Sequence, residues 1–448
     1  MSLVAKKLKN DYFHLLWPLL IEQVFMMLIG NVNIFLYSRY NDQVVAAIGI
    51  ADQILVIGTM AMGIVSLGST ILFLQNAADD QLPYLRGVVR QSVFLNMILG
   101  LIIVLVALFL GREIMSWMQT PKEILGASIL YFRMVSLSLI FQAISTSAAA
   151  LLRAFGKVKL SMGISIINTL LIITGNALVV LTPFSLFGEG IFGLSVATII
   201  TRIVGAVFSI VCIKQILPQV WQGIFTFNHK DWQIGQRILA LGVPSGMENV
   251  SYNFSQTIIT AVIASLGTAQ ISARIYTQTL TAIVFTLSVA AGQAGQVILG
   301  RLSRKKELKE AQTFSLNNMF LFMGIGASIN LVIALVGPWI LQIFTSDPEI
   351  IHIARILLWM NVLYDPLRAG NEIIIASLNV MGEVRYPVYM ALLVTYLFTV
   401  PGSVLVGSIL EWGIIFIWII FILDEGIRLG LFVRRWQRGE WMQHAKYF

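Results

Sequence analysis

This chain of 448 residues has little charge and almost no cysteine. Only 12% of its residues are charged, whereas an average soluble domain has about 25%, and 57% are hydrophobic, with a mean hydropathy of +0.83. These values exclude an ordinary soluble enzyme. Because Cys212 is the only cysteine, an intramolecular disulfide and a cysteine-based metal cluster are excluded as well. The histidines are scattered along the chain, so the sequence predicts no metal site and no bound cofactor: His14, His229, His352 and His444.

Long apolar runs, in contrast, recur from Leu15 almost to Val433. Runs of more than about 18 apolar residues are typical of transmembrane helices. Divided at charged and turn-rich positions, they predict an all-α integral membrane protein with twelve transmembrane helices. The predicted ranges are 13–38, 45–77, 90–111, 124–151, 160–182, 189–214, 238–265, 270–299, 312–337, 350–377, 387–408 and 411–433.

The basic residues are distributed unevenly between the two sides of the membrane. With the N-terminus inside, 21 Lys and Arg residues fall on cytoplasmic segments, but only Arg39, Arg112 and Lys122 fall on outer ones. Since cytoplasmic segments are the ones that retain Lys and Arg, both termini are expected in the cytoplasm. The same bias explains the net charge of +8 without a nucleic-acid partner. The expected location is the inner membrane of a bacterial cell, as a multi-pass protein.

The two halves of the chain are related in sequence. Pro18-Leu-Leu-Ile-Glu22-Gln-Val24 recurs as Pro244-Ser-Gly-Met-Glu248-Asn-Val250, and Leu152-Arg-Ala-Phe-Gly156-Lys-Val158 recurs as Leu378-Asn-Val-Met-Gly382-Glu-Val384. Both motifs recur after the same interval, the one that separates Pro18 from Pro244, which we call the repeat offset. Six helices in each half give both halves the same orientation, as in the parallel repeats of alternating-access transporters. We therefore expect an N-terminal six-helix lobe at 1–215, an amphipathic cytoplasmic connector at 216–236 and a C-terminal six-helix lobe at 237–448.

Glu22 and Glu248 are the strongest candidates for chemistry within the membrane. An ionisable side chain in the hydrocarbon costs about 2.5–3.5 kcal/mol on insertion scales. Each Glu follows a proline by four residues, and proline removes a backbone donor and can loosen the helix beside the carboxylate. A buried Glu without a fixed cation can take up and release a proton near neutral pH. The alternative is a permanently protonated Glu that is hydrogen-bonded to a neighbouring helix.

Polar residues share a helix face with each of these glutamates. Asn33 lies almost three helical turns after Glu22, so both project from one face with Gly30 and Met26. The later helix carries a similar face beyond Glu248, with these residues on it or beside it: Asn249, Tyr252, Asn253, Ser255 and Gln256. Such faces suit an aqueous central cavity, although hydrogen bonding between packed helices explains some of them equally well.

Two further groups of charged residues lie in later helices. In the helix expected at 350–377, Arg368 is three residues from Asp365 and four from Glu372, so their charges can largely neutralise one another around a proline kink. This pattern fits substrate contact and a structural role equally. The helix expected at 411–433 has charges at similar spacing, which we interpret as a structural ion pair: Asp424, Glu425 and Arg428.

Taken in order along nearly the whole chain, several stretches resemble the multidrug and toxic compound extrusion (MATE) transporters of bacteria. They are Ala46-Ala47, Leu152-Arg153-Ala154-Phe155-Gly156, Leu241-Gly242-Val243-Pro244, Ser265-Leu266-Gly267-Thr268, Pro366 to Gly382, Asp424-Glu425-Gly-Ile-Arg428 and Arg434-Arg435-Trp436-Gln437-Arg438-Gly439-Glu440-Trp441. The resemblance implies two six-helix bundles in a V-shaped transporter, which exports amphipathic, often cationic compounds in exchange for Na⁺ or H⁺.

The chain departs from the family pattern where ion coupling is expected. Many bacterial members have Asp at the position of Asn33 and near that of Asn176, and Asn can ligate a cation but cannot carry a proton. Another branch has Glu at the position of Tyr252, one turn from Glu248, and an acidic residue near Arg368. We infer that coupling has shifted to Glu22 and Glu248, and that H⁺ is favoured over Na⁺.

The predicted function is a secondary active antiporter that exports small amphipathic or cationic organic compounds, acting as a monomer in the lipid bilayer. The predicted coupling residues are Glu22, Glu248, Asn33 and Asn176, and the predicted substrate cavity contains Tyr252, Asn253, Gln256, Asn249, Asp365, Arg368 and Glu372. A lipid-linked oligosaccharide flippase is the alternative, although a more cationic lumen or extra helices would be expected of it. A membrane-embedded transferase is less compatible, since the short loops offer no His/Asp or metal-binding acidic cluster.

Overall fold

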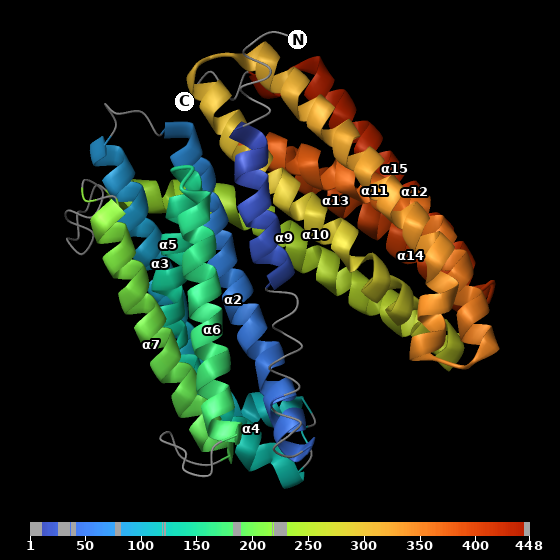
Figure 1. The fold of residues 1–448 in the computed structure, drawn as a ribbon, viewed down its shortest axis with the longest axis horizontal. Helices are drawn as coiled ribbons and strands as arrows, with labels where there is room; N and C mark the ends of the chain where they lie inside the picture. Colours follow the sequence, from blue (N-terminus) through green and yellow to red (C-terminus); the bar gives the residue numbers. More distant parts are fainter. Residues whose placement is uncertain are drawn as a thin grey trace. The chain divides into compact units, whose positions relative to one another are not determined.

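The protein is almost entirely helical. The computed structural model describes residues 11–25, 36, 42–76, 82–118, 120, 122–181, 190–216, 218 and 231–442. Within these ranges the chain is helical apart from short turns, as Figure 1 shows. The predicted all-α class is therefore confirmed, and each of the twelve predicted ranges contains helical residues.

The first described helix lies at 11–25. The helices of the first half are α2 (Asp42–Asn76), α3 (Leu82–Trp117), α4 (Lys122–Leu137), α5 (Leu139–Ala154), α6 (Val158–Leu181) and α7 (Gly190–Ile216). Those of the second half are α9 (Asp231–Ser265), α10 (Thr268–Arg304), α11 (Leu308–Phe344), α12 (Pro348–Val380), α13 (Arg385–Val394), α14 (Val400–Val404) and α15 (Ile414–Arg438). Two π-helical turns, Thr395–Thr399 and Leu405–Ile409, flank α14 and continue the helix between α13 and α15.

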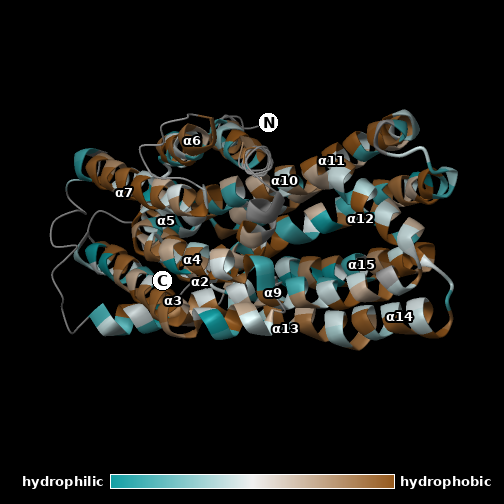
Figure 2. Ribbon diagram, turned by 90° about the horizontal axis from the view of Figure 1, so that it is seen from below, coloured by the Kyte–Doolittle hydropathy of each residue, from teal (hydrophilic) through white to brown (hydrophobic). Residues whose placement is uncertain are grey.

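The helices are long and apolar enough to make this a multi-pass membrane protein. Among the described residues, eight helices could cross a membrane by length and composition, and nine if the bent pair α4–α5 is counted as one span. Figure 2 shows apolar residues along most of α3, α7 and α11. Large apolar side chains also point outward, for example Phe109 and Leu397, which are 74% and 73% exposed. Such surfaces are stable against lipid rather than against water.

The sequence repeat is reproduced in the helices. The first residues of α2 and α10, of α3 and α11, and of α4 and α12 are each separated by the repeat offset. The last residues of α5 and α12 are separated by the same offset. The two copies differ in one place, because α4 and α5 meet at a 47° bend, whereas α12 continues past the corresponding position as one helix that contains Pro366. The predicted parallel repeat of two halves is therefore confirmed.

The chain divides into two compact units, which we call the N-terminal unit (Ile21–Gly246) and the C-terminal unit (Met1–Leu20 with Met247–Phe448). The boundaries at 20/21 and 246/247 again differ by the repeat offset, and each lies just after a helix proline, Pro18 or Pro244. The division predicted from sequence, at 215 and 237, is different: it assigned the first helix of each half, the one at 11–25 or α9, wholly to the lobe formed by that half. The predicted connector at 216–236 lies mostly outside the described residues, and its last part begins α9.

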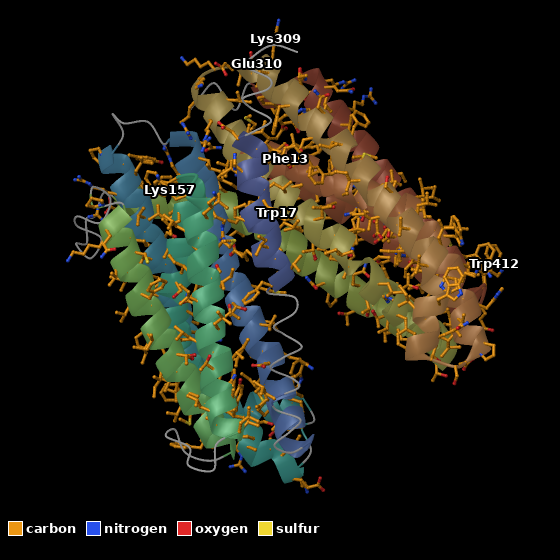
Figure 3. All side chains as sticks on the ribbon, in the orientation of Figure 1. Phe13, Trp17, Lys157, Lys309, Glu310 and Trp412 are labelled. Atoms are coloured by element: carbon orange, nitrogen blue, oxygen red, sulfur yellow. The ribbon has the colours of Figure 1, made fainter. Side chains whose placement is uncertain are left out.

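The first helix of each half begins in the unit that is formed mainly by the other half. Contacts of two kinds lie at these helix beginnings. In the N-terminal unit, Asp231 at the start of α9 forms an ion pair with Arg90 of α3. In the C-terminal unit, the hydroxyl of Tyr12 donates a hydrogen bond to the backbone oxygen of Ala291 at 3.2 Å. Phe13 and Trp17, one turn apart on the same helix, are 42% and 64% exposed and are labelled in Figure 3.

α2 and α9 pack very closely against each other within the N-terminal unit. A Cβ atom on Gly242 would lie 2.3 Å from the backbone oxygen of Ile64, and one on Gly68 would lie 2.2 Å from that of Ile238. Glycine at both positions therefore allows the two backbones to approach each other, as small residues do between membrane helices. Gly63, also in α2, has no atom within 4 Å of such a Cβ.

We predict that Gly242→Ala lowers the unfolding temperature of the purified protein, by an amount equivalent to about 1–3 kcal/mol, because the new methyl group meets backbone that cannot rotate away. Gly63→Ala is the matched control and should leave the unfolding temperature unchanged or slightly higher, since Ala favours the helix over Gly. Thermal unfolding in detergent measures both. Equal unfolding temperatures for the two variants would show that the helices do not pack this closely.

Candidate functional site

The C-terminal unit contains an open cavity of about 600 Å³, including the space at its mouth. The cavity is formed by α9, α10, α12, α13 with the π-helical turn that follows, and α15. Its lining combines charged, polar and apolar side chains: Ser251, Tyr252, Phe285, Arg368, Asn371, Glu372, Ile375, Ala391, Leu392, Thr395, Glu425 and Arg428. A cavity with four charged groups in a unit with such apolar helices calls for a functional explanation.

One side of the cavity is a hydrogen-bonded network between α15 and α12. Arg428 donates to Asp424, with which it forms an ion pair, and to the Oε1 atom of Glu425 at 3.1 Å. Asn371 of α12 donates to the Oε2 atom of Glu425 at 2.6 Å and to its backbone oxygen at 2.8 Å. The predicted ion pair within α15 is therefore present. The network also connects α15 to α12, because the second carboxylate is shared with Asn371.

Arg368 lies on the other side of the cavity and is held by aromatic rings. Its guanidinium carbon is 3.8 Å from the centre of the Phe285 ring and 5.5 Å from that of Tyr252. Spacing on α12 predicted that Asp365 and Glu372 would neutralise Arg368. The charge of Arg368 does act on both Asp365 and Glu372, although no ion pair joins it to a carboxylate within the described residues.

Glu372 and Asp365 occupy different environments. Glu372 lines the cavity together with Arg368. Asp365 is buried, with only 4% of its surface exposed, and is not part of the lining. It lies near Thr281 and Asn330, in the polar interior where Trp418 donates to Asn361 at 2.7 Å. Of the three charged residues predicted for this helix, two therefore reach the cavity.

The polar face predicted for α9 divides between the cavity and the surface. Tyr252 lines the cavity, whereas Asn253 is exposed. Gln256, one turn further along, accepts a hydrogen bond at 2.8 Å from Arg274, whose side chain is buried and also donates to Thr260. The side chains of Glu248 and Asn249 lie outside the described structure, although both residues are in α9.

Glu22 has a fixed cation in the structure. The Nη1 atom of Arg153 lies 3.3 Å from the Oε1 atom of Glu22, and the hydroxyl of Ser165 donates to the same oxygen at 2.6 Å. The sequence-based hypothesis for Glu22 assumed a buried carboxylate without a fixed cation. The contact with Arg153 is a cation that this hypothesis did not include.

The other two predicted coupling residues of the first half are less informative. Asn176 is completely buried in α6. Asn33 lies outside the described residues.

The N-terminal unit has its own partly buried polar group around Arg202 of α7. Arg202 donates to Ser138, at the bend between α4 and α5, at 2.7 Å, and its charge also acts on Asp52 of α2. Arg202 and Arg428 are separated by the repeat offset, so each repeat carries an arginine at the same position of its last helix. The sequence reasoning missed Asp52 and Phe285, but it could have found the arginine pair by applying the repeat offset to each charged residue.

Comparison with known proteins agrees with this architecture. The MatE family matches residues 18–178 and 244–405, two segments whose starts are again separated by the repeat offset. The uncharacterized transporter YisQ of Bacillus subtilis is 30% identical over 96% of this chain and 94% of its own length. The probable multidrug resistance protein NorM of Thermotoga maritima is 20% identical over 98% of this chain and 94% of its own length.

Solved structures show the same fold. The crystal structure of the Vibrio cholerae MATE transporter VcmN in the bent form matches with a TM-score of 0.86 over 99% of both chains, at 18% identity. The family match covers most of the chain and is accompanied by a full-length relative at 30% identity. The chain therefore belongs to the MatE family of multidrug and toxic compound extrusion transporters, and it is a membrane transporter rather than an enzyme.

Proposed function

We propose that this transporter is a secondary active efflux antiporter, which exports amphipathic compounds carrying a positive charge and takes up H⁺ in exchange. The cavity of the C-terminal unit carries the proposal. It brings aromatic rings, two arginines and two glutamates together between helices of which several are apolar enough to span a membrane. Ionisable groups in membrane-spanning helices are costly, and substrate binding and proton transfer are functions that offset this cost.

The repeat supports a coupling proton in the second half. Glu22 and Glu248 correspond at the repeat offset, but their surroundings differ in sequence. The counterpart of Arg153 is Asn379, and that of Ser165 is Ala391, so neither partner of Glu22 is reproduced for Glu248. Because the second repeat has no basic residue at the position of Arg153, Glu248 is the better candidate of the two for protonation and deprotonation during transport. We therefore assign the coupling proton to Glu248.

The proposed orientation places both termini in the cytoplasm of a bacterial cell, with the protein acting as a monomer in the inner membrane. Figure 3 places Lys309 and Glu310, at the start of α11, at the end of the C-terminal unit opposite to Trp412. The basic segment before α11 and the turn before α15 thus lie at opposite ends of this unit, which agrees with the alternation of the predicted spans. The excess of Lys and Arg on the first of these sides favours the cytoplasm there.

Ethidium transport into proteoliposomes tests the function directly. An acidic lumen without Na⁺ should drive ethidium inward as H⁺ leaves, and collapse of the pH gradient with an ionophore should stop it. A Na⁺ gradient at equal pH should give no transport above protein-free vesicles. Transport driven by Na⁺ alone would replace H⁺ as the coupling ion, whereas no transport under either gradient would favour the lipid flippase.

A further inference from the structure

Basic residues gather at one end of the C-terminal unit, on the turn between α10 and α11 and at the end of α15. These two segments, 301–310 and 434–440, contain eight basic residues and three acidic ones. We call their surface the basic end, and its basic residues are Arg301, Arg304, Lys305, Lys306, Lys309, Arg434, Arg435 and Arg438. At the repeat offset, the first half has no basic residue in 75–84 and only Lys214 in 208–214. The cluster therefore belongs to the second repeat alone.

Hydrogen bonds hold the two segments of the basic end beside each other. Gln312 of α11 donates to the backbone oxygens of Trp436 and Gln437 at 2.8 and 3.0 Å, and the indole N–H of Trp436 donates to that of Gln312 at 3.2 Å. Trp436 is fully buried and stacks on Trp441, with ring centres 4.2 Å apart. Lys309 lies one turn before Gln312, so it shares this end with the basic residues of α15.

Only part of this positive charge is compensated within the protein. The salt bridges of the basic end are Arg301–Asp11, Arg435–Glu383, Arg435–Glu440 and Arg438–Glu440. The side chains of Lys305, Lys306, Lys309 and Arg434 are exposed, and none of them forms a salt bridge within the described residues. The acidic residues of the turn, Glu307 and Glu310, are fewer. The exposed surface thus keeps a net positive charge.

An apolar stripe on α15 leads to the basic end. Its residues recur every three or four positions and are between 41% and 49% exposed: Phe416, Ile419, Leu423 and Ile427. Arg434, two turns after the last of them, continues the same face. The counterparts of the last three in α7 are small and buried, namely Gly193, Ala197 and Thr201. The stripe, like the basic end, is therefore specific to the second repeat.

The length of α15 puts Arg434 at the depth of lipid headgroups. From Ile414 to Arg434 the helix is about 30 Å long, which is the thickness of the hydrocarbon core of a bilayer. Trp412, just before α15, is 55% exposed, as is typical of residues at a membrane interface. Figure 3 shows Trp412 at the opposite end of the unit from Lys309. When the stripe faces acyl chains, the basic end therefore faces headgroups.

We propose that the basic end and the stripe of α15 form a binding site for an anionic phospholipid, with its phosphate at Lys309 and Arg434 and an acyl chain along the stripe. A zwitterionic lipid adds an ammonium group, which this surface repels, so a headgroup with a net negative charge is favoured. The general bias of Lys and Arg toward one side of a membrane does not explain the cluster, because both repeats have the same orientation. The inference is independent of the transported compound and of the coupling ion.

Native mass spectrometry of the purified full-length protein in a neutral detergent measures lipid binding directly. Dioleoylphosphatidylglycerol should bind roughly tenfold more tightly than dioleoylphosphatidylcholine, which has the same acyl chains and a zwitterionic headgroup. Equal affinities would overturn the proposal. Glycerophosphoglycerol, the headgroup without acyl chains, should bind far more weakly, and binding as tight as that of the lipid would show that the stripe takes no part.

Two double variants locate the site. Lys309→Gln with Arg434→Gln should weaken phosphatidylglycerol binding roughly tenfold and leave phosphatidylcholine binding within about twofold. Lys157→Gln with Lys159→Gln is the matched control, because it removes the same charge from two exposed lysines of the N-terminal unit, and its affinity should stay within about twofold of wild type. Since all four side chains are exposed, both variants should unfold at the wild-type temperature without lipid. An equal loss of affinity in the two variants would contradict a site at the basic end.

Discussion

Glu248→Gln is expected to abolish proton-driven ethidium transport while leaving the protein folded and able to bind ethidium. Gln has nearly the same shape as Glu but cannot release a proton, so only the exchange of H⁺ is removed. Ethidium transport by the variant should fall to the level measured with protein-free vesicles. Transport in proteoliposomes under a pH gradient measures it, and ethidium fluorescence polarisation checks binding.

Glu22→Gln is the matched control, because the repeat places it at the same position of the first half. Its carboxylate is held by Arg153 and Ser165, so we expect a lower unfolding temperature and retained proton-driven transport. Normal transport in Glu248→Gln would remove that residue from the mechanism. Loss of transport in both variants, with both folded, would mean that the two halves couple to protons together.

Arg428→Met is expected to be the most destabilising single substitution in the cavity. It leaves the carboxylates of Asp424 and Glu425 buried without their shared cation. Removing one partner from a buried ionic network typically costs about 3–5 kcal/mol. The unfolding temperature of the purified protein should therefore fall strongly, and the yield from membranes should fall with it.

Two further variants separate this explanation from a general loss of packing. Adding Asp424→Asn and Glu425→Gln to Arg428→Met removes the uncompensated charges and should recover much of the lost stability. Arg202→Met changes the corresponding arginine of the first half, which donates to Ser138 at 2.7 Å and whose charge acts on Asp52. It should cost less stability than Arg428→Met, because Arg428 forms ion pairs with two carboxylates. If the triple variant were no more stable than Arg428→Met, buried charge would not be the cause.

The helices and the repeat could be predicted from the sequence because both follow from local patterns. Apolar runs between charged segments define spans in a membrane, and a single repeat offset relates two motifs. The structure extends that offset to the starts of three helix pairs and to the boundaries of the two units. That Pro18 and Pro244 occupy matching positions was visible in the sequence. Their place beside the unit boundaries was not, since it depends on contacts such as that of Tyr12 with Ala291.

The partners of the charged side chains were harder to predict. Spacing along α12 predicted that the charge of Arg368 acts on Asp365 and Glu372, as it does, but it did not predict the contact of Arg368 with Phe285 of α10, which is distant in sequence. Similarly, nothing near Glu22 in sequence indicates Arg153, which approaches from α5. Spacing predicted the ion pair of α15 correctly, because all of its members lie within one helical turn or so. Local patterns thus find pairs within a helix and miss those that tertiary packing creates.

Proton movement measured together with drug movement tests the central proposal most directly. A pH-sensitive dye enclosed in acidic, Na⁺-free proteoliposomes reports loss of lumenal H⁺ when ethidium is added outside. An H⁺ antiporter coupled in the C-terminal unit predicts an ethidium-dependent rise of lumenal pH for wild type and Glu22→Gln, and none for Glu248→Gln. An ethidium-dependent rise that persists in Glu248→Gln and disappears in Glu22→Gln would contradict this mechanism and place the coupling proton in the N-terminal unit.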